Sequence, residues 1–113
     1  MRVLFVCSRN RWRSPTAERI FRGRPGIEVR SRGLARVARR RLREVDVAWA
    51  QLILVMEDAH LDRLAERFAA ALGATPVRVL DIPDDYRFMD PALVAALEEA
   101  VTPILEAALA AGD

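Results

Sequence analysis

The stretch that decides the fold is Val3-Leu4-Phe5-Val6-Cys7, followed directly by Ser8-Arg9-Asn10-Arg11-Trp12-Arg13-Ser14-Pro15. Its first part is an apolar run that predicts a buried strand. Ser14-Pro15-Thr16-Ala17-Glu18 is typical of a helix start, because proline is favoured in the first turn. The loop between them, residues 8–13, is therefore predicted to lie at the N-terminus of a helix.

Cys7, the only cysteine among 113 residues, stands at the end of this strand, six positions before Arg13. The reactive form of a cysteine is the thiolate, whose usual pKa of about 8.5 must be lowered by positive charge or a helix N-terminus. Successive N–H groups of such a loop can surround a tetrahedral oxyanion, and an arginine adds a planar pair of donors. The pattern predicts a cysteine-dependent phosphatase. The alternative interpretation is a small buried hydrophobic residue at a strand end.

The motif Cys7-x-x-Asn10-x-x-Arg13-Ser14-Pro15 after a first strand resembles the signature of low-molecular-weight protein tyrosine phosphatases. The resemblance continues through residues 28–34, which include Ser31-Arg32-Gly33, through residues 50–57 followed by His60, and into an acidic loop before the last helix. A compact bacterial branch of these phosphatases is the most similar. The resemblance implies the phosphotyrosine protein phosphatase I-like fold and hydrolysis of a phosphomonoester through a cysteinyl-phosphate.

The resemblance also implies roles for the loop residues. Cys7 would be the nucleophile, and the phosphate-binding residues would be Ser8, Arg9, Asn10, Arg11, Trp12, Arg13 and Ser14. Ser14 would hydrogen-bond Cys7 and assist its departure. Asn10 would adopt the left-handed backbone region, and Ser31 would support Asn10. The alternatives for Ser14 and Ser31 are a helix cap and an ordinary strand-end hydroxyl.

Three loop positions differ from the family pattern. Arg9 stands where the family usually has glycine, so we expect either a different backbone or local strain. Trp12 stands where many members carry a second cysteine, so oxidation of Cys7 would have no internal resolving thiol. Arg11 replaces a residue that is often aliphatic. With Arg9 and Arg11 at its mouth, the pocket is expected to favour substrates with additional negative charge.

The general acid that protonates the leaving oxygen is expected in the acidic segment before the last helix, which contains Asp81, Asp84, Asp85 and Asp90. Two places in it share parts of the family motif. Asp84-Asp85-Tyr86 has the aspartate, the tyrosine and the spacing of the family motif, but no proline. Asp90-Pro91 has the dipeptide, yet it also fits a helix N-cap with proline in the first position. We predict Asp84, with Asp85 close behind and Asp90 as the remaining alternative. Tyr86 and Phe88 are predicted as an aromatic wall or as core packing.

Apolar runs and helical patterns alternate along the chain, which predicts an α/β fold with a doubly wound, four-stranded parallel sheet flanked by helices. The expected strands are residues 2–6, 27–30, 52–56 and 77–80, and the expected helices are residues 14–22, 38–49, 59–72 and 91 onward. Pro103 is expected to kink or break the last helix near Val101-Thr102. The Arg39-Arg40-Arg41 run is interpreted as a solvated helix face, and His60 as a surface or capping residue.

The size and composition suit one domain over residues 1–113. No apolar stretch reaches 18 residues, so we expect a cytoplasmic protein without a membrane partner. Residues 1–43 contain fourteen arginines and two carboxylates, a net charge of +12, whereas residues 44–113 carry −10. The basic half would attract anionic substrates. One cysteine and one histidine exclude an internal disulfide and the common zinc spacings, and no cofactor is expected.

Three functional hypotheses compete. The first is a phosphatase that acts on a phosphorylated protein or a small phosphomonoester. The second is thiol-linked arsenate reduction, which on a chain with one cysteine would need an external thiol. The third is a non-catalytic module that binds phosphate and recognises nucleic acid or a phosphorylated partner, although no nucleic-acid signature is present. We favour the phosphatase, and the oligomeric state is not predicted.

Overall fold

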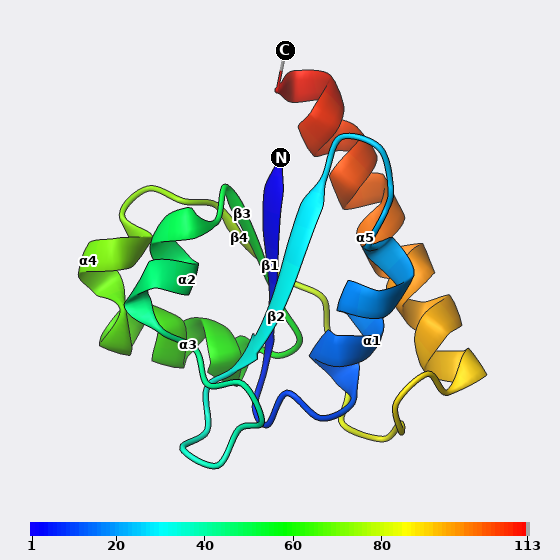
Figure 1. Ribbon diagram of the computed structural model, residues 1–113, viewed down its shortest axis with the longest axis horizontal. Helices are drawn as coiled ribbons and strands as arrows, with labels where there is room; N and C mark the ends of the chain where they lie inside the picture. Colours follow the sequence, from blue (N-terminus) through cyan, green and yellow to red (C-terminus); the bar gives the residue numbers. More distant parts are fainter. Residues whose placement is uncertain (113) are drawn as a thin grey trace.

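The computed structural model describes residues 1–112, which build one four-stranded parallel sheet flanked by helices (Figure 1). The strands are β1 (Arg2–Cys7), β2 (Glu28–Gly33), β3 (Leu52–Val55) and β4 (Val77–Val79), in the order β2-β1-β3-β4. All neighbouring strands are parallel, so their carboxyl ends lie together at the same end of the sheet. The predicted α/β fold is confirmed.

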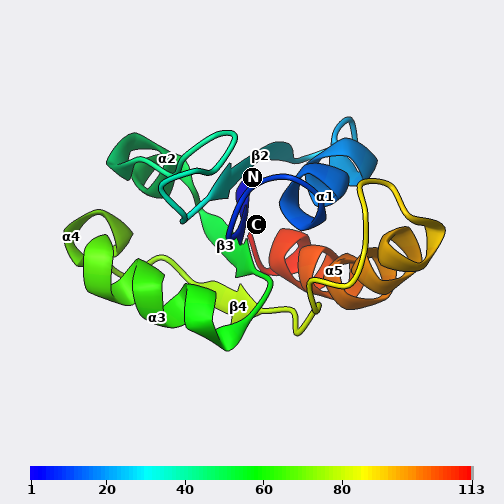
Figure 2. The ribbon, with the colours of Figure 1, turned by 90° about the horizontal axis from the view of Figure 1, so that it is seen from below.

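Helices cover both faces of the sheet (Figures 1 and 2). On one face lie α1 (Arg13–Phe21) and α5 (Pro91–Ala111), and on the other lie α2 (Glu44–Trp49), α3 (Asp58–Arg67) and α4 (Ala69–Leu72). None of the helices within residues 1–112 combines the length and the apolarity needed to cross a bilayer.

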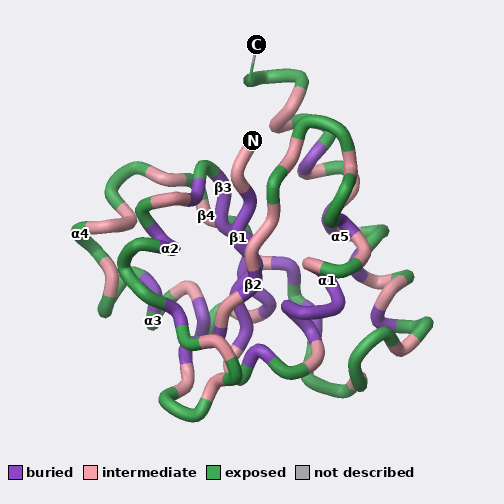
Figure 3. Tube along the Cα trace, viewed as in Figure 1, coloured by how far each residue is buried: buried purple, intermediate pink, exposed green. Residues whose placement is uncertain are grey.

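Alternation along β1 divides the core into two layers. Val3, Phe5 and Cys7 pack with α1 and α5, whereas Leu4 and Val6 pack on the side of α2 and α3. These residues are almost completely buried, and the buried part of the trace runs through the centre of the molecule in Figure 3. Since successive side chains of a strand point to opposite faces, β1 must place Cys7 toward α1.

The helix predicted over residues 38–49 is present only in its last part, α2. Before it, the backbone N–H of Leu42 donates to the carbonyl of Gly33, and the N–H of Gly33 donates to the carbonyl of Arg40. The N–H of Arg39 donates to the carbonyl of Arg9. These long-range bonds replace the helical i to i−4 bonds. The interpretation of the arginine run as a solvated helix face is therefore wrong.

One helix expected to be continuous is divided, and the break considered in another is absent. The segment predicted as one helix over residues 59–72 is divided at Phe68, where φ is −126° and the chain leaves the helical conformation. By contrast, α5 continues through Pro103 without interruption. Pro103 and Glu99, whose carbonyl loses its N–H partner, are both exposed, so water can take the place of that partner.

Candidate active site

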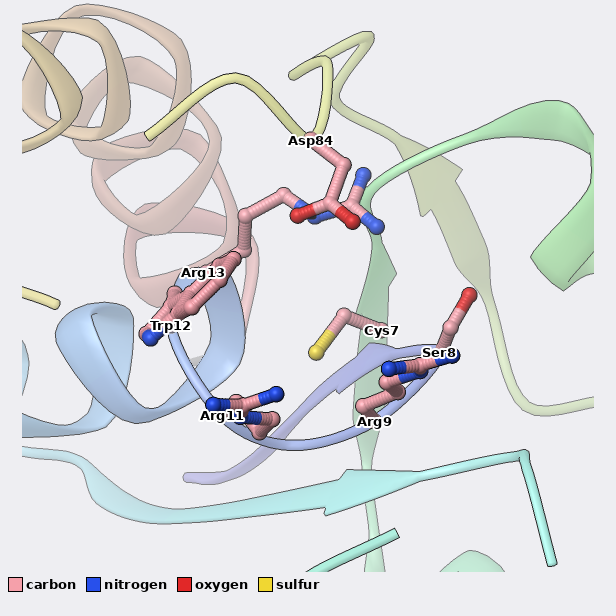
Figure 4. Close-up of a pocket in the computed structure, with 7 residues that line it drawn as sticks. All are labelled: Cys7, Ser8, Arg9, Arg11, Trp12, Arg13 and Asp84. Atoms are coloured by element: carbon pink, nitrogen blue, oxygen red, sulfur yellow. Dashed lines mark ion pairs between the residues drawn. The ribbon is translucent and has the colours of Figure 1, made fainter. Parts of the chain in front are cut away.

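A cleft of about 250 Å³ lies at the carboxyl end of β1, where the chain turns into α1 (Figure 4). The residues that line it are Cys7, Ser8, Arg9, Arg11, Trp12, Arg13 and Asp84. Six of them come from the predicted phosphate-binding loop and its nucleophile, and the seventh is the predicted acid. The fold therefore brings together two segments that are more than seventy positions apart in the sequence.

Cys7 lies at the base of this cleft with its side chain 3% exposed. Its Sγ is 2.9 Å from Oγ of Ser14, in the first turn of α1. The Ser14 Oγ also accepts a hydrogen bond from Nδ2 of Asn10 at 2.9 Å, so its own hydrogen is free to be donated to the sulfur. A hydroxyl that donates to sulfur stabilises the thiolate form.

Asn10 adopts the left-handed backbone region, with φ of 53°. Its side chain is fully buried, and Nδ2 donates to both Ser14 and Ser31, whereas Oδ1 accepts from Nε of Arg40. Arg9 is not among the residues with positive φ. The strain considered for Arg9 is therefore absent, because the loop makes its left-handed turn at Asn10, a residue type that tolerates this region.

Ser31, Glu18 and Arg40 form a second group behind Asn10. The Ser31 Oγ accepts from Asn10 at 3.0 Å and from Arg40 at 2.9 Å, and donates to Oε1 of Glu18 at 2.6 Å. Arg40 also contacts Oε1 of Glu18 at 2.6 Å. The hydroxyl of Ser31 thus uses its one hydrogen and both acceptor positions. The sequence did not identify Arg40 as part of this group.

Gly33, at the end of β2, permits the close approach of the loop. A Cβ at this position would lie 2.7 Å from the carbonyl oxygen of Ser8 and 3.0 Å from the carbonyl carbon of Arg9. It would also lie 2.6 Å from Cβ of Ala38. Any side chain here would have to displace backbone atoms of the loop, which is why glycine is needed.

Arg13 is fixed by three groups from outside the loop. Its Nη1 donates to Oε2 of Glu57 at 2.5 Å and to the carbonyl of Ile82 at 2.8 Å. Its Nε lies 3.6 Å from Oδ1 of Asp84. The hydrogen bond from Arg13 holds the pKa of Glu57 below its usual range. No hydrogen bond or ion pair within residues 1–112 uses Nη2 of Arg13, so this nitrogen can serve a bound oxyanion, whereas Nε already faces Asp84.

His60 links the start of α3 to the loop. Its Nδ1 accepts from the backbone N–H of Glu57 at 3.1 Å, and its Nε2 lies 2.9 Å from Oγ of Ser8. Since Nδ1 is an acceptor, a neutral His60 carries its proton on Nε2 and donates it to Ser8. Burial, with a contribution from the charge of Arg13, lowers the pKa of His60 to about 4, which keeps the ring neutral at pH 7.

The interpretation of His60 as a capping residue agrees with its contact to the Glu57 N–H, but its proposed surface position is wrong, since it is only 2% exposed. Sequence reasoning missed the contacts that Glu57 and His60 make with the loop. The spacing of three positions at a helix start was a signal for the cap. Nothing local in the sequence indicated that these two side chains would reach Arg13 and Ser8.

The three candidate acids lie in different surroundings. Asp84 lines the cleft beside Arg13, with its side chain 57% exposed. Asp85 is exposed and is not among the lining residues. Asp90 is the N-cap of α5, where its Oδ1 accepts from the N–H of Ala92 at 2.9 Å and Pro91 occupies the first turn. The geometry therefore favours Asp84 for a proton-transfer role.

The two predicted aromatic residues are separated by the fold. Tyr86 is partly buried and packs against the core layer of α1 and α5. Phe88 is 46% exposed and borders a hollow next to the cleft, together with Arg11 and Trp12. Of these two residues, Phe88 is the more exposed and lies next to Trp12, which lines the cleft itself.

No family model matches the chain, but individual proteins and solved structures are similar to it. The protein-arginine-phosphatase of Geobacillus stearothermophilus is 31% identical over an aligned region that covers 66% of this chain and 66% of that protein, just under two thirds of its length.

Two solved structures have the same architecture. The YwlE arginine phosphatase from Geobacillus stearothermophilus superposes with a TM-score of 0.70 and 26% identity, covering 89% of this chain and 86% of that one. The tyrosine phosphatase Wzb from Escherichia coli K30, solved with phosphate, has a TM-score of 0.73 and 25% identity, with coverage of 93% and 96%. Both likenesses therefore cover most of the chain.

Proposed function

Because the chain belongs to the low-molecular-weight protein tyrosine phosphatase family, we propose that it is a cysteine-dependent phosphatase acting through a cysteinyl-phosphate. The resemblance noted in the sequence is confirmed, and the comparisons support a cysteine-based phosphatase function. The observation that carries the proposal is the single cleft in which Cys7, Arg13 and Asp84 meet.

In the first proposed step, the Cys7 thiolate attacks the phosphorus atom of the substrate. The S–P bond forms as the bond to the leaving oxygen breaks, and the carboxyl group of Asp84 gives its proton to that oxygen. The loop N–H groups and Arg13 bind the three equatorial phosphoryl oxygens. Because these donors are already oriented, they stabilise the charge of the transition state without reorganisation.

In the second proposed step, water attacks the phosphorus of the cysteinyl-phosphate. The Asp84 carboxylate accepts a proton from this water, the S–P bond breaks, and inorganic phosphate is released. The hydrogen that Ser14 directs at Sγ, 2.9 Å away, stabilises the departing thiolate. Asn10 and Ser31 are positioning residues in this scheme, because they orient Ser14 and the loop backbone.

The proposed substrate is a phosphorylated protein, with phosphotyrosine as the first candidate, and small phosphomonoesters are also accepted. A second candidate is phosphoarginine, because the relative with 31% identity is a protein-arginine-phosphatase. Peptides that differ only in carrying phosphotyrosine or phosphoarginine separate the two, by the ratio of their kcat/KM values. A ratio far above one in favour of phosphotyrosine supports the first candidate, and the reverse supports the second.

The proposal extends to the whole of residues 1–113 as one phosphatase domain located in the cytoplasm. One sheet with helices on both faces supports the single domain. A reducing compartment suits a nucleophilic thiol that has no second cysteine in the chain to form a disulfide with.

The test is hydrolysis of an aryl phosphate by the wild-type protein and by Cys7→Ser, combined with acid quenching and mass spectrometry. We expect turnover and a trapped phosphate on the wild-type chain, and loss of both in the variant, by more than about 10⁴-fold in kcat. Turnover that survives in Cys7→Ser contradicts the proposal. A wild-type protein that binds phosphate without turnover supports the binding module instead.

A further inference from the structure

Two further hollows adjoin the proposed catalytic cleft beside α1. The cleft shares Arg11 and Trp12 with a neighbouring hollow of about 310 Å³. That hollow shares Pro15, Arg39 and Phe88 with a further one of about 220 Å³. We call the two outer hollows together the flanking groove. Since each hollow shares lining residues with the next, a bound chain can pass from the cleft into the groove without leaving the surface.

The walls of the flanking groove are strongly basic. Four exposed arginines line it, namely Arg11, Arg19, Arg22 and Arg39. Within residues 1–112, none of the four takes part in an ion pair. The one carboxylate of the groove, Glu18, is already paired with Arg40 at 2.6 Å. The groove therefore presents positive charge that the protein itself does not neutralise.

The arginines are attached to parts of the backbone that are fixed relative to the cleft. The N–H of Arg39 donates to the carbonyl of Arg9, in the phosphate-binding loop, at 3.0 Å. Arg19 lies in the last turn of α1 and Arg22 directly follows that helix, three positions apart and hence on the same side. Because α1 begins at Arg13, its position relative to the cleft is set by the catalytic loop.

We infer that the flanking groove binds the acidic side chains of a phosphorylated protein segment whose phosphorylated residue occupies the cleft. Asp and Glu close to the phosphorylated residue would pair with Arg39, Arg19 and Arg22, whereas apolar parts of the segment would contact Pro15 and Phe88. The inference rests on the proposed phosphatase function and specifies its substrate class. Opposite charges on the groove and on the substrate would raise both the rate at which the two molecules associate and the affinity of the complex.

A protein segment fits these observations better than a nucleic acid does. The cleft holds the buried Cys7 thiol beside Arg13 in a volume of about 250 Å³, which suits a terminal phosphate group, whereas the internal phosphates of a nucleic acid are diesters. The groove wall also includes Phe88, which is 46% exposed and borders both outer hollows, so that apolar side chains can pack against it. Nucleic-acid binding would instead depend on phosphate contacts along a longer basic surface and show a steep salt dependence.

The test compares two phosphotyrosine peptides that differ only in carrying Asp and Glu, or Asn and Gln, around the phosphorylated residue. For the wild-type protein at low ionic strength, we expect kcat/KM to be about threefold to tenfold higher for the acidic peptide, from two or three exposed charge pairs. This ratio should fall toward one as salt is added. Arg39→Gln and the double variant Arg19→Gln/Arg22→Gln should lower the ratio even at low salt.

Arg78→Gln is the matched control, because Arg78 is an exposed arginine on β4, at the opposite edge of the sheet from β2. Its ratio should equal that of the wild-type protein. A wild-type ratio of one, or a ratio unchanged in the groove variants, overturns the inference. Competition by single-stranded RNA that the groove variants abolish also overturns it, by assigning the groove to nucleic acid.

The same data separate this inference from the proposed function. If the protein hydrolyses an aryl phosphate but does not distinguish the two peptides, only the role of the flanking groove is wrong. If the phosphotyrosine peptides, a phosphoarginine peptide and the aryl phosphate all fail to be hydrolysed, the phosphatase proposal itself is wrong.

Discussion

The two sides of the cleft, the loop of residues 7–13 and the segment of residues 81–90, differ in how they are supported. Asn10, Arg13 and Ser14 are buried, and their side chains are hydrogen-bonded to residues from other elements. The acidic segment is attached near its ends, where the N–H of Ile82 donates to Met56 and the N–H of Met89 donates to Thr16. Between these points Tyr86 packs against the core, but the other residues, Asp84 among them, are exposed.

This difference corresponds to two chemical tasks. An oxyanion of fixed shape is stabilised best by donors that need no reorganisation, which requires a rigid loop. The proton donor must reach the leaving oxygen of substrates that differ in size. A segment with few contacts can adapt to them at little cost. Substitutions on one side of the cleft at a time should therefore separate the two tasks.

Among changes that leave Cys7 in place, the largest effect is expected from Asp84→Asn, on the exposed side. Loss of a general acid lowers kcat by about 10²- to 10⁴-fold for a substrate with a poor leaving group. The effect should be much smaller for a nitrophenyl phosphate, whose leaving group needs little protonation. The measurement is kcat for both substrates in Asp84→Asn, with Asp90→Asn as the control. If Asp90→Asn shows the larger and leaving-group-dependent loss, the acid is Asp90.

Ser31→Ala tests the support of the rigid side, because Ser31 accepts a hydrogen bond from Asn10 of the loop. The change leaves Asn10, Glu18 and Arg40 each without one partner, and an unsatisfied buried group costs about 1–3 kcal/mol. We expect denaturant unfolding to report a loss of this size, and kcat to fall for good and poor leaving groups alike. Dependence of the loss on the leaving group would mean that Ser31 acts through the acid and not through the loop.

The rigid side should also respond to pH through His60. Its pKa is lowered to about 4 in the folded protein, whereas an unfolded histidine titrates near 6.5. The unfolded state therefore binds more protons between these two values. The contribution of His60 to the free energy of unfolding should be fully present above about pH 6.5 and should decrease as the pH falls toward 4. After allowance for solvent screening we expect a loss of about 1–2 kcal/mol. Denaturant melts at several pH values measure it, and His60→Gln should flatten the dependence.

Asp85→Asn should have the smallest effect of all. Asp85 is exposed and makes no hydrogen bond or ion pair within residues 1–112, so its removal should change stability by less than about 0.5 kcal/mol. The kcat for either kind of leaving group should stay within about twofold of wild type. A large loss of kcat in this variant would place the proton donor at Asp85 and contradict the choice of Asp84.

Local sequence signals were sufficient for the parts of the molecule that local interactions determine. The apolar run of β1, the proline at the start of α1 and the alternation of strands and helices predicted the sheet and the position of the loop. The resemblance to known phosphatases added the pairing of Asn10 with Ser31. Spacing to the last helix led to the prediction of Asp84 as the acid, and the N-cap pattern of Asp90-Pro91 is present at the start of α5.

The contacts that escaped prediction join segments distant in sequence. Glu57 and His60 reach the loop from α3, and Arg40 reaches Asn10 and Glu18 from a segment expected to be helical. The helical propensity of residues 38–43 is overridden by backbone bonds to Gly33 and Arg9. Periodicity gives no information about such pairings, because they depend on the order in which the strands are arranged.

Because glycine has no side chain, Gly33 makes the shape of the proposed anion site depend on how β1 and β2 are paired. Cys7 and Gly33 are partners in the parallel register of β1 and β2, and the loop carbonyls rest directly on this pair. A shift of one residue in that register would replace the glycine by a neighbour with a side chain and displace the loop. New specificity can therefore evolve at the rim, where Arg11 and Phe88 are exposed, whereas the floor of the site can change only together with the sheet.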